Sequence, residues 1–453
     1  MKLRRTLLTL ACFGMVSVAS AQDTTPFTVQ ADKILDRFVP SDGPSAAVTV
    51  TRDGKVIYET ARGNASLELH TPAKSTDVYR IGSITKTVTA AAVLLLDSQG
   101  RLRITDPLSK YLPDYPGGAG ITLAELLNHT AGISDAWDVD PNKTLDTKTL
   151  VDLISKQPVD FTPGSDWRYS NSGYMLLGAV IERVTGESWH RFEREAVLER
   201  FGMSHTGYYA DDAVVPDAVQ GYSADADGKV AKPPFVSITG PMTAGALAST
   251  SGDIAHLAEG LGNPKLYPRE VYTAMTSPTK LPDGSVSPYS YGLFHYTLRG
   301  EQAFGHNGGI EGFNSQFIFV PKSHVVVAVL ANSDAGMPSA RAIALQLAAA
   351  AIGRPYRSFK DKALSESEKK NLVGNYQIQG DQVHALTEEG GEIYVQRAPG
   401  PKRHLIPAEG DLLYYAGEAT DYFHVVKAPD GKVTSLEFYT DGMGPARKEP
   451  RTK

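Results

Sequence analysis

Apolar positions in the first quarter of the chain follow two different patterns. The segment Thr87–Leu96 is apolar on nearly every side, which predicts a helix that passes through a core. Earlier in the chain, Ala46–Val50 and Val56–Tyr58 flank the turn formers Arg52–Gly54. This arrangement predicts a strand, a turn and a second strand. A sheet is therefore expected to begin before the buried helix.

The same patterns return later in the chain. Helical periodicity appears in three further segments: 172–184, 254–261 and 337–352. Thr122–Glu125 has the pattern of a capping box at the start of a short helix. Two apolar runs, 314–320 and 325–330, flank Pro321 and predict a second hairpin. Because strands lie at both ends of 22–355, we expect an α+β domain whose sheet combines distant segments and is covered by an all-helical insertion.

The composition changes after Gly353. Residues 356–370 are polar and charged, which predicts a linker. Over 371–453, short strand patterns alternate with turn sequences such as Glu389–Gly391 and Pro429–Gly431. The strand patterns cover 393–395, 412–415, 422–426 and 433–439. This spacing predicts a small antiparallel β-sheet or β-barrel at the end of the chain.

The first residues of the chain have the pattern of a signal peptide over 1–21. Three basic residues within Lys2–Arg5 precede the apolar stretch Thr6–Val18, and Ala19–Ala21 has the small residues of a cleavage site. Export is therefore expected. The single cysteine, Cys12, lies inside this segment, so the mature protein would have no disulfide and no thiol nucleophile.

Composition excludes several classes of function. The chain has 453 residues with 42% hydrophobic and 21% charged residues, which is typical of a globular protein of two or three domains. The formal net charge of −6 would become −9 without the three basic residues of the signal peptide, and so acidic a chain is a poor nucleic-acid ligand. No later run reaches the roughly 18 apolar residues of a membrane span. The histidines form no closely spaced ligand set, so we expect no metal and no cofactor.

Ser83 is the candidate nucleophile. It stands at the start of the buried helix with Lys86 one turn later, which places a hydroxyl and an amine on one helical face. The hydroxyl would lie at the positive end of the helix dipole beside a proton acceptor, as activation of a weak nucleophile requires. The same spacing occurs at Ser277 and Ser367, but there it falls among turn formers and in a charged run. Taken alone, Lys86 is equally consistent with a helix-end lysine that extends to water.

Two other segments could complete a hydrolytic site. Tyr169 and Asn171 precede a helical pattern; a tyrosine beside a cation loses its proton more readily, and an asparagine amide can bind a carbonyl. Gly305–Gly309 falls just before the late strands, and its glycines would let a substrate approach the backbone closely. His129 and Thr130 are better interpreted as residues that hold a loop through side-chain hydrogen bonds.

Taken together, these motifs resemble those of the serine β-lactamase and penicillin-binding protein superfamily, especially its class C β-lactamase-like branch. The ordered set is Ser83-Ile-Thr-Lys86, Tyr169-Ser-Asn171 and His306-Asn-Gly308. The resemblance covers about 38–353 and implies an antiparallel sheet packed by helices, with the site between the sheet and the helical region. Residues 371–453 resemble the lipocalin-like barrels appended to some members.

The resemblance also implies roles for individual residues. Ser83 would attack an amide, lactam or ester carbonyl, and water would then hydrolyse the acyl-enzyme. Lys86 and Tyr169 would share the general-base role, and the sequence leaves open which of them holds the proton. The residues assigned to substrate binding are Asn171, His306, Gly308 and Gly309. Backbone N–H groups of Ser83 and Gly309 would form the oxyanion hole.

The nature of residue 306 limits the choice of substrate. β-Lactamases usually carry a lysine where this chain has His306, and an unperturbed histidine is mostly neutral at pH 7. We therefore favour a D-amino-acid amide or peptide, or a small ester, as the substrate. A β-lactamase or D-alanyl-D-alanine carboxypeptidase is an alternative, and so is a non-catalytic protein of the same fold that binds cell-wall peptides. By analogy with the family we favour the periplasm over full secretion; the sequence leaves the oligomeric state open.

Overall fold

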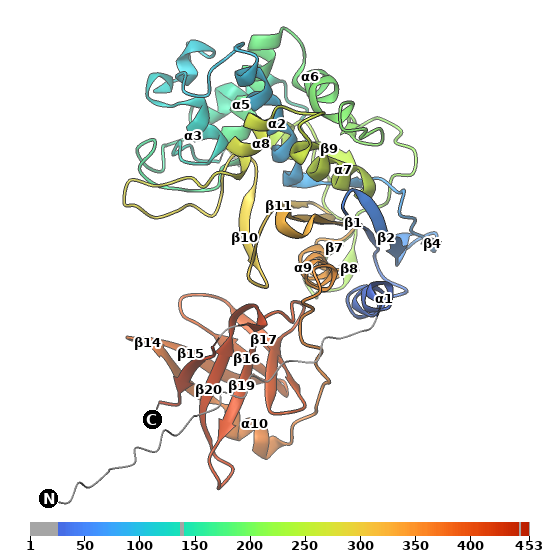
Figure 1. Ribbon diagram of the computed structural model, residues 1–453, viewed down its shortest axis with the longest axis vertical. Coiled ribbons are helices and arrows are strands. Elements are labelled where there is room, and N and C mark those ends of the chain that lie inside the picture. Colours follow the sequence, from blue (N-terminus) through green and yellow to red (C-terminus); the bar gives the residue numbers. More distant parts are fainter. Residues whose placement is uncertain (1–25, 136–139, 444, 453) are drawn as a thin grey trace, which may run out of the picture.

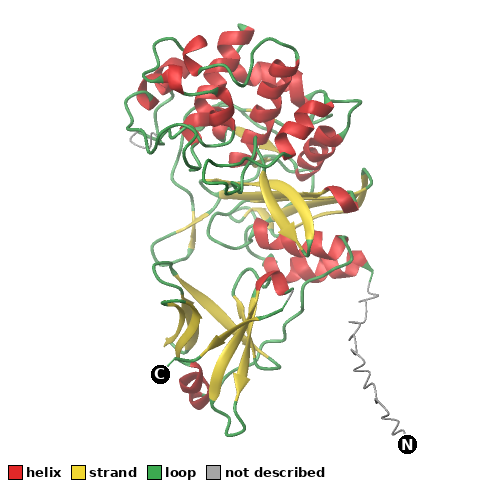
Figure 2. Cartoon of the chain, turned by 60° about the vertical axis from the view of Figure 1, so that its left-hand side comes forward, coloured by secondary structure: helices red, strands yellow, loops and turns green. Residues whose placement is uncertain are grey.

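The computed structural model describes residues 26–135, 140–443 and 445–452, so the expected signal peptide lies outside the described residues. The described chain is elongated, with a helical region at one end, a sheet in the middle and a barrel at the other end (Figure 1). In Figure 2 the sheet lies between two layers of helices, and the barrel lies beyond the smaller layer. Among the helices described, none has the length and apolarity needed to cross a membrane.

The central sheet has six antiparallel strands in the order β10-β11-β12-β13-β1-β2. Their bounds are β1 (Ala46–Arg52), β2 (Lys55–Arg62), β10 (Phe294–Leu298), β11 (Glu301–Ile310), β12 (Phe313–Val320) and β13 (Val325–Ala331). Early and late segments meet where β1 pairs with β13, from Ala46 opposite Ala331 to Arg52 opposite Val325. The expected antiparallel sheet built from distant parts of the chain is therefore confirmed.

Strand β13 is apolar throughout because both of its faces are buried. Val325, Val327 and Val329 belong to the core formed with helices α1 (Phe27–Phe38) and α9 (Ala340–Ala351). Val326, Ala328 and Leu330 belong to the core on the other face of the sheet, which the larger helical region forms. Successive side chains of a strand point to opposite faces, so one unbroken apolar run serves two cores.

The larger helical layer holds the predicted buried helix, α2 (Thr85–Ser98). The other helices of the region are α3 (Leu123–Leu127), α4 (Thr147–Ile154), α5 (Asn171–Thr185), α6 (Trp189–Glu193), α7 (Ser251–Gly262) and α8 (Arg269–Thr276). Thr122 and Glu125 form the expected capping box on α3. Short strands accompany these helices: β3 (Asn64–Ser66), β4 (Thr71–Pro72), β5 (Tyr79–Arg80), β6 (Gly207–Tyr208), β7 (Ser223–Ala224), β8 (Val230–Ala231) and β9 (Leu247–Ser249).

The C-terminal part is a nearly closed antiparallel barrel of eight strands, each paired with the next along the chain. The strands are β14 (Gly374–Gln379), β15 (Gln382–Glu389), β16 (Glu392–Gln396), β17 (Lys402–Ala408), β18 (Leu412–Tyr415), β19 (Tyr422–Lys427), β20 (Val433–Tyr439) and β21 (Arg447–Pro450). A bridge between Tyr376 and Arg451 joins the first strand to the end of the last. Helix α10 (Glu366–Leu372) precedes the barrel.

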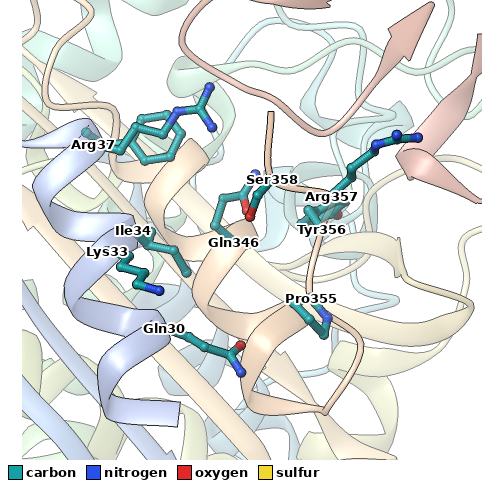
Figure 3. A pocket seen from close by; sticks show the side chains of 10 residues that line it. Gln30, Lys33, Ile34, Arg37, Gln346, Pro355, Tyr356, Arg357 and Ser358 are labelled. Carbon is teal, nitrogen blue, oxygen red and sulfur yellow. The ribbon is translucent and has the colours of Figure 1, made fainter. Parts of the chain in front are cut away.

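The segment expected as a linker packs between the two parts of the molecule. Phe359 stacks on Tyr414 of the barrel with ring centroids 4.5 Å apart, and the Arg37 guanidinium lies 5.0 Å from the centre of the same tyrosine ring. A cavity of about 160 Å³ remains beside these contacts, between α1, α9 and residues 355–358 (Figure 3). The barrel is thus packed against the α1 and α9 layer, on the opposite side of the sheet from the larger helical region.

Candidate active site

Ser83 lies in a single 3₁₀ turn, Gly82–Ile84, that leads directly into α2. Gly82 has φ of +51°, and a Cβ added to it would lie 2.9 Å from the Gly309 nitrogen. The Ser315 hydroxyl donates a 2.8 Å hydrogen bond to the Ile81 carbonyl, which ties the turn to β12. Only glycine allows this left-handed turn to press against β11, so the nucleophile candidate is held at the edge of the sheet.

Lys86 is fully buried at the first turn of α2. Its Nζ lies 2.7 Å from the Asn171 Oδ1, 2.7 Å from the Ala244 carbonyl oxygen and 3.1 Å from the Ser83 Oγ. Burial lowers the pKa of Lys86 to about 7, although the Asp135 carboxylate acts in the opposite direction. The amine is therefore divided between its charged and neutral forms near neutral pH.

Tyr169 lies over the same amine. The Lys86 Nζ is 4.9 Å from the centre of the Tyr169 ring, and the His129 ring packs against the tyrosine with centroids 4.3 Å apart. Burial raises the pKa of Tyr169 above its usual value, and Asp135 adds to this, whereas the Ser83 hydroxyl lowers it. The phenol therefore keeps its proton at neutral pH.

Asn171 is the first residue of α5, which Ser170 caps by accepting a hydrogen bond from the Gly173 N–H. Its amide nitrogen donates to the Asp135 Oδ2 at 3.0 Å, while its oxygen accepts from Lys86. Asp135 also accepts from the Ser170 hydroxyl and, at 3.0 Å, from the Ser172 N–H. The amide of Asn171 thus separates the Lys86 amine from a carboxylate.

His129 contacts the segment that carries Tyr169 and Asn171. It is buried, and its Nδ1 accepts a 3.2 Å hydrogen bond from the Ser170 N–H. Burial lowers the pKa of His129 well below its usual value, and Lys86 lowers it further, so the ring is neutral. The neighbouring Thr130 hydroxyl donates to the Asn128 Oδ1 at 2.7 Å. Both residues form loop-holding hydrogen bonds of the kind expected from the sequence.

His306 and Gly308 are buried inside β11 and are not on the wall of the cavity beside Ser83. The His306 Nδ1 lies 2.6 Å from the Asn307 carbonyl oxygen, which fixes the proton on this nitrogen, and Nε2 accepts from the Tyr289 hydroxyl at 2.9 Å. Burial and the nearby Lys86 lower the pKa of His306 to about 3. The motif precedes β12 and β13 as expected, but it also lies within a strand of its own, β11, which the sequence did not predict.

The glycines of this motif differ in their surroundings. A Cβ on Gly305 would lie 2.0 Å from the Phe317 carbonyl oxygen, and one on Gly308 would lie 1.9 Å from the Ile81 carbonyl oxygen. Gly309 is exposed, and a Cβ there would meet no atom within 4 Å. The close backbone approach made possible by Gly305 and Gly308 is therefore made by the protein itself, and only Gly309 is open to a ligand.

The candidate residues that the structure brings together line one cavity of about 400 Å³, here called the serine cavity. Ser83, Tyr169, Asn171 and Gly309 are on its wall, and Lys86 lies directly behind Ser83 and Asn171. The remaining wall residues are Asp140, Pro141, Lys143, Leu145, Leu150, Met175, Val236, Ser237, Gly240, Pro241, Ala244, Gly245, Ile310 and Glu311. This volume suits a small organic or dipeptide-sized ligand.

Sequence reasoning missed Asp135, the Ala244 carbonyl and Tyr289. Asp135 stands in a loop between two helices, and Ala244 acts through its backbone, so neither carries a local motif. Tyr289 stands in an irregular segment that belongs to none of the motifs. Among the described residues, no group of three or more metal-ligating side chains comes together.

Comparisons with known proteins agree with this architecture. A family model described as Beta-lactamase matches residues 31–352. A penicillin-binding protein of Bacillus subtilis (strain 168) is 24% identical over 390 residues, which span 80% of this chain and 86% of that protein. The solved octameric penicillin-binding protein homologue from Pyrococcus abyssi superposes with a TM-score of 0.66 at 23% identity, over 93% of this chain and 99% of that one. The D-stereospecific amidohydrolase from Streptomyces sp. superposes with a TM-score of 0.62 at 26% identity, over 70% and 97% respectively.

Proposed function

This chain belongs to the Beta-lactamase family of serine hydrolases, and from that premise we propose that it cleaves D-amino-acid amides or peptides, or small esters, through an acyl-enzyme on Ser83. The proposal combines the family's chemistry with the contacts of this serine. Two solved proteins of similar fold, a D-stereospecific amidohydrolase and a D-amino acid amidase, support the choice of substrate class.

The observation that carries the proposal is the set of acceptors around the Lys86 amine. A neutral amine has two N–H groups, and the Asn171 Oδ1 and the Ala244 carbonyl accept both at 2.7 Å. Its lone pair is then left for the Ser83 hydroxyl, 3.1 Å away. Lys86 is therefore the base that removes the Ser83 proton while the Ser83 oxygen bonds to the substrate carbonyl carbon.

Tyr169 is proposed as the acid. Its phenol remains protonated at neutral pH because burial raises its pKa, and it lies beside Ser83 on the wall of the serine cavity. As the tetrahedral intermediate collapses and the bond to the leaving group breaks, the phenol donates its proton to the leaving nitrogen or oxygen. The protonated Lys86 amine then returns a proton to the Tyr169 oxygen beside Ser83. Water finally hydrolyses the ester on Ser83.

The backbone around Gly309 offers the groups that a developing oxyanion needs. Strand β10 pairs with β11 only as far as Gly305, so 307–309 has no partner strand on that edge in the described chain. The Gly309 backbone lies against the turn that contains Ser83. The N–H groups of Ser83 and Gly309 are proposed as the oxyanion hole, where removal of one donor typically costs about 10²–10³ in rate.

The third motif provides no cation for a substrate carboxylate beside the scissile bond. His306 is buried, neutral and hydrogen-bonded to Tyr289, so β11 presents no fixed positive charge at the place where β-lactamases usually have lysine. A β-lactam or a D-alanyl-D-alanine peptide would therefore lose an ionic contact that those enzymes provide. This absence supports amides and esters as substrates over the alternative that the protein is a β-lactamase or carboxypeptidase.

The proposal also includes export of the protein and the division of the chain into domains. Residues 1–21 are proposed as a signal peptide that directs the protein to the periplasm, because basic, apolar and small residues follow one another there. The proposed units are a hydrolase domain over 22–355, a connecting segment over 356–370 and a barrel domain over 371–453.

Labelling of Ser83 tests the proposal. The wild-type protein and a Ser83→Ala variant are exposed to a fluorophosphonate, a penicillin and an activated ester, and their intact masses are compared. We expect an adduct with at least one probe in the wild type and none in the variant. A hydrolysis screen across esters, D-aminoacyl amides, D-Ala-D-Ala peptides and cephalosporins then identifies the substrate class. Equal labelling and equal turnover in the two proteins would exclude Ser83 as the nucleophile.

A further inference from the structure

Glu311 is a carboxylate on the wall of the serine cavity that the proposed chemistry does not use. The residue is partly buried, and among the described residues it forms no hydrogen bond and no ion pair within 4 Å. Asp140, the other acid on the wall, is exposed and accepts two hydrogen bonds from Asn142. Of the two acids, Glu311 is thus the one that has no hydrogen-bond partner in the described chain and is partly shielded from water.

A second cavity of about 360 Å³, here called the lateral cavity, adjoins the first. The two cavities share two wall residues, Val236 and Glu311. The lateral wall combines apolar residues with charged ones, among them the partly buried Arg80 and the exposed Asp211 and Lys232. Burial lowers the pKa of Arg80, and the negative charges of Asp211 and Glu311 counteract this, although no contact within 4 Å joins Arg80 to Glu311. Glu311 therefore stands at the junction of the two cavities, and its carboxylate oxygens have no hydrogen-bond partner among the described residues.

The position of Glu311 along the chain places it close to the reacting carbonyl. It follows β11 directly and is two residues from Gly309, so the two Cα atoms are at most about 7 Å apart. An α-amino group is separated from the carbonyl carbon of its own residue by one carbon atom. A carbonyl held at Gly309 therefore keeps its α-amino group within reach of a glutamate side chain two residues further on.

We propose that Glu311 binds the protonated α-amino group of the substrate and so selects aminoacyl compounds with a free amine. This inference rests on the proposed function, because the position of the carbonyl follows from Ser83 and Gly309. An ammonium group brings three donors to a carboxylate that has none, and a charge-assisted hydrogen bond shielded from water is stronger than a neutral one. An N-acylated substrate lacks the charge and would also place a bulky group beside Glu311.

The test compares two ligands that differ only in the amine: D-leucine p-nitroanilide and N-acetyl-D-leucine p-nitroanilide. In the wild type we expect kcat/KM to favour the free amine at least tenfold. In Glu311→Gln, which keeps shape and removes charge, this ratio should fall at least tenfold, mainly through KM, and in Glu311→Asp it should fall less. In the control Asp140→Asn the ratio should stay within twofold. A wild type without preference, or a Glu311→Gln ratio within twofold of the wild type, overturns the proposal.

A binding experiment separates this proposal from the catalytic one. Calorimetry on the Ser83→Ala background measures the affinities of D-leucine amide and N-acetyl-D-leucine amide without turnover, with and without Glu311→Gln. A preference for the free amine that disappears with Glu311→Gln supports the binding role even if Ser83 proves not to be the nucleophile. If Glu311 served only as a counterion for Arg80, its substitution would lower the melting temperature and leave the affinity ratio unchanged, which would refute the proposal.

Discussion

The serine cavity and the barrel both contain buried ionisable groups, but the partners that stabilise these groups differ. In the barrel, Glu449 is fully buried and its two carboxylate oxygens accept from His384 at 2.8 Å and from Arg447 at 2.7 Å. At the serine cavity, Lys86 is equally buried, but Asn171 separates it from the Asp135 carboxylate. Direct contact with an opposite charge stabilises the ionised form of a buried group. An amide between the two groups weakens this stabilisation, so the amine can lose its proton more readily.

The most damaging change removes the amine altogether. In Lys86→Met an apolar chain of similar length fills the same space, and nothing remains to take the Ser83 proton. We expect kcat/KM to fall about 10³- to 10⁴-fold, within the range of a lost general base. Steady-state hydrolysis of the best substrate from the screen measures this loss. Retention of more than a tenth of the wild-type activity would mean that Lys86 is not the base.

Asn171→Asp places a carboxylate directly beside the buried amine of Lys86, as in the direct ion pairs of the barrel. A carboxylate in direct contact with Lys86 favours the charged amine and raises its pKa, so a smaller fraction is neutral at pH 7. We expect kcat/KM at pH 7 to fall roughly 10²-fold and to recover at alkaline pH. The pH profile distinguishes this from structural damage, which would lower activity at every pH; Asn171→Leu, which has no charge, serves as the control.

The wild-type pH profile tests the neutral amine without any substitution. Because burial lowers the pKa of Lys86 to about 7, the catalytic base is protonated below that pH and free above it. We therefore expect kcat/KM to fall about tenfold per pH unit below pH 7 and to level off above it. An ordinary lysine would instead give a rise near its usual pKa of about 10.4. Profiles between pH 5 and 9 separate the two cases.

The smallest expected effect on activity comes from breaking the ion cluster of the barrel. Glu449→Gln leaves the buried His384 and the exposed Arg447 without their anion, and we expect a loss of about 2 kcal/mol in barrel stability, as for hydrogen bonds to a charged group. Hydrolytic kcat/KM should stay within twofold of the wild type, because the cluster lies in a different part of the chain from Ser83. Thermal unfolding and kinetics on the same sample check both statements, and a tenfold loss of activity would reveal coupling between the two parts.

Long apolar runs and compact motifs could be predicted from the sequence. The strands 314–320 and 325–330 and the helix of Ser83 agree with β12, β13 and α2 to within a few residues, because their burial on all sides leaves an unbroken apolar pattern. Lys86 and Asn171 were found because each belongs to a short motif. The structure brings both motifs together around one amine.

The remaining features depend on contacts that no local pattern records. Strand β11 is rich in glycine, with low strand propensity, and its alternation does not reveal that His306 points into the core. Asp135 reaches Asn171 from a loop far away in sequence, so only the folded chain links them. The barrel strands β15 and β17 carry few consecutive apolar residues because one face of each is only partly buried.

The adjacent glycines of β11 also differ in the variation they can accept. At Gly308 any side chain would collide with the Ile81 backbone, so neither natural nor engineered substitutions are tolerated at that position. Gly309 has ordinary backbone geometry and empty space around it, so alanine, serine or larger residues fit there without disturbing the fold. Each added atom would take volume from the serine cavity beside Ser83. Position 309 is thus a place where the size of the accepted acyl group can diverge between homologues, or be adjusted in the laboratory, by a single substitution.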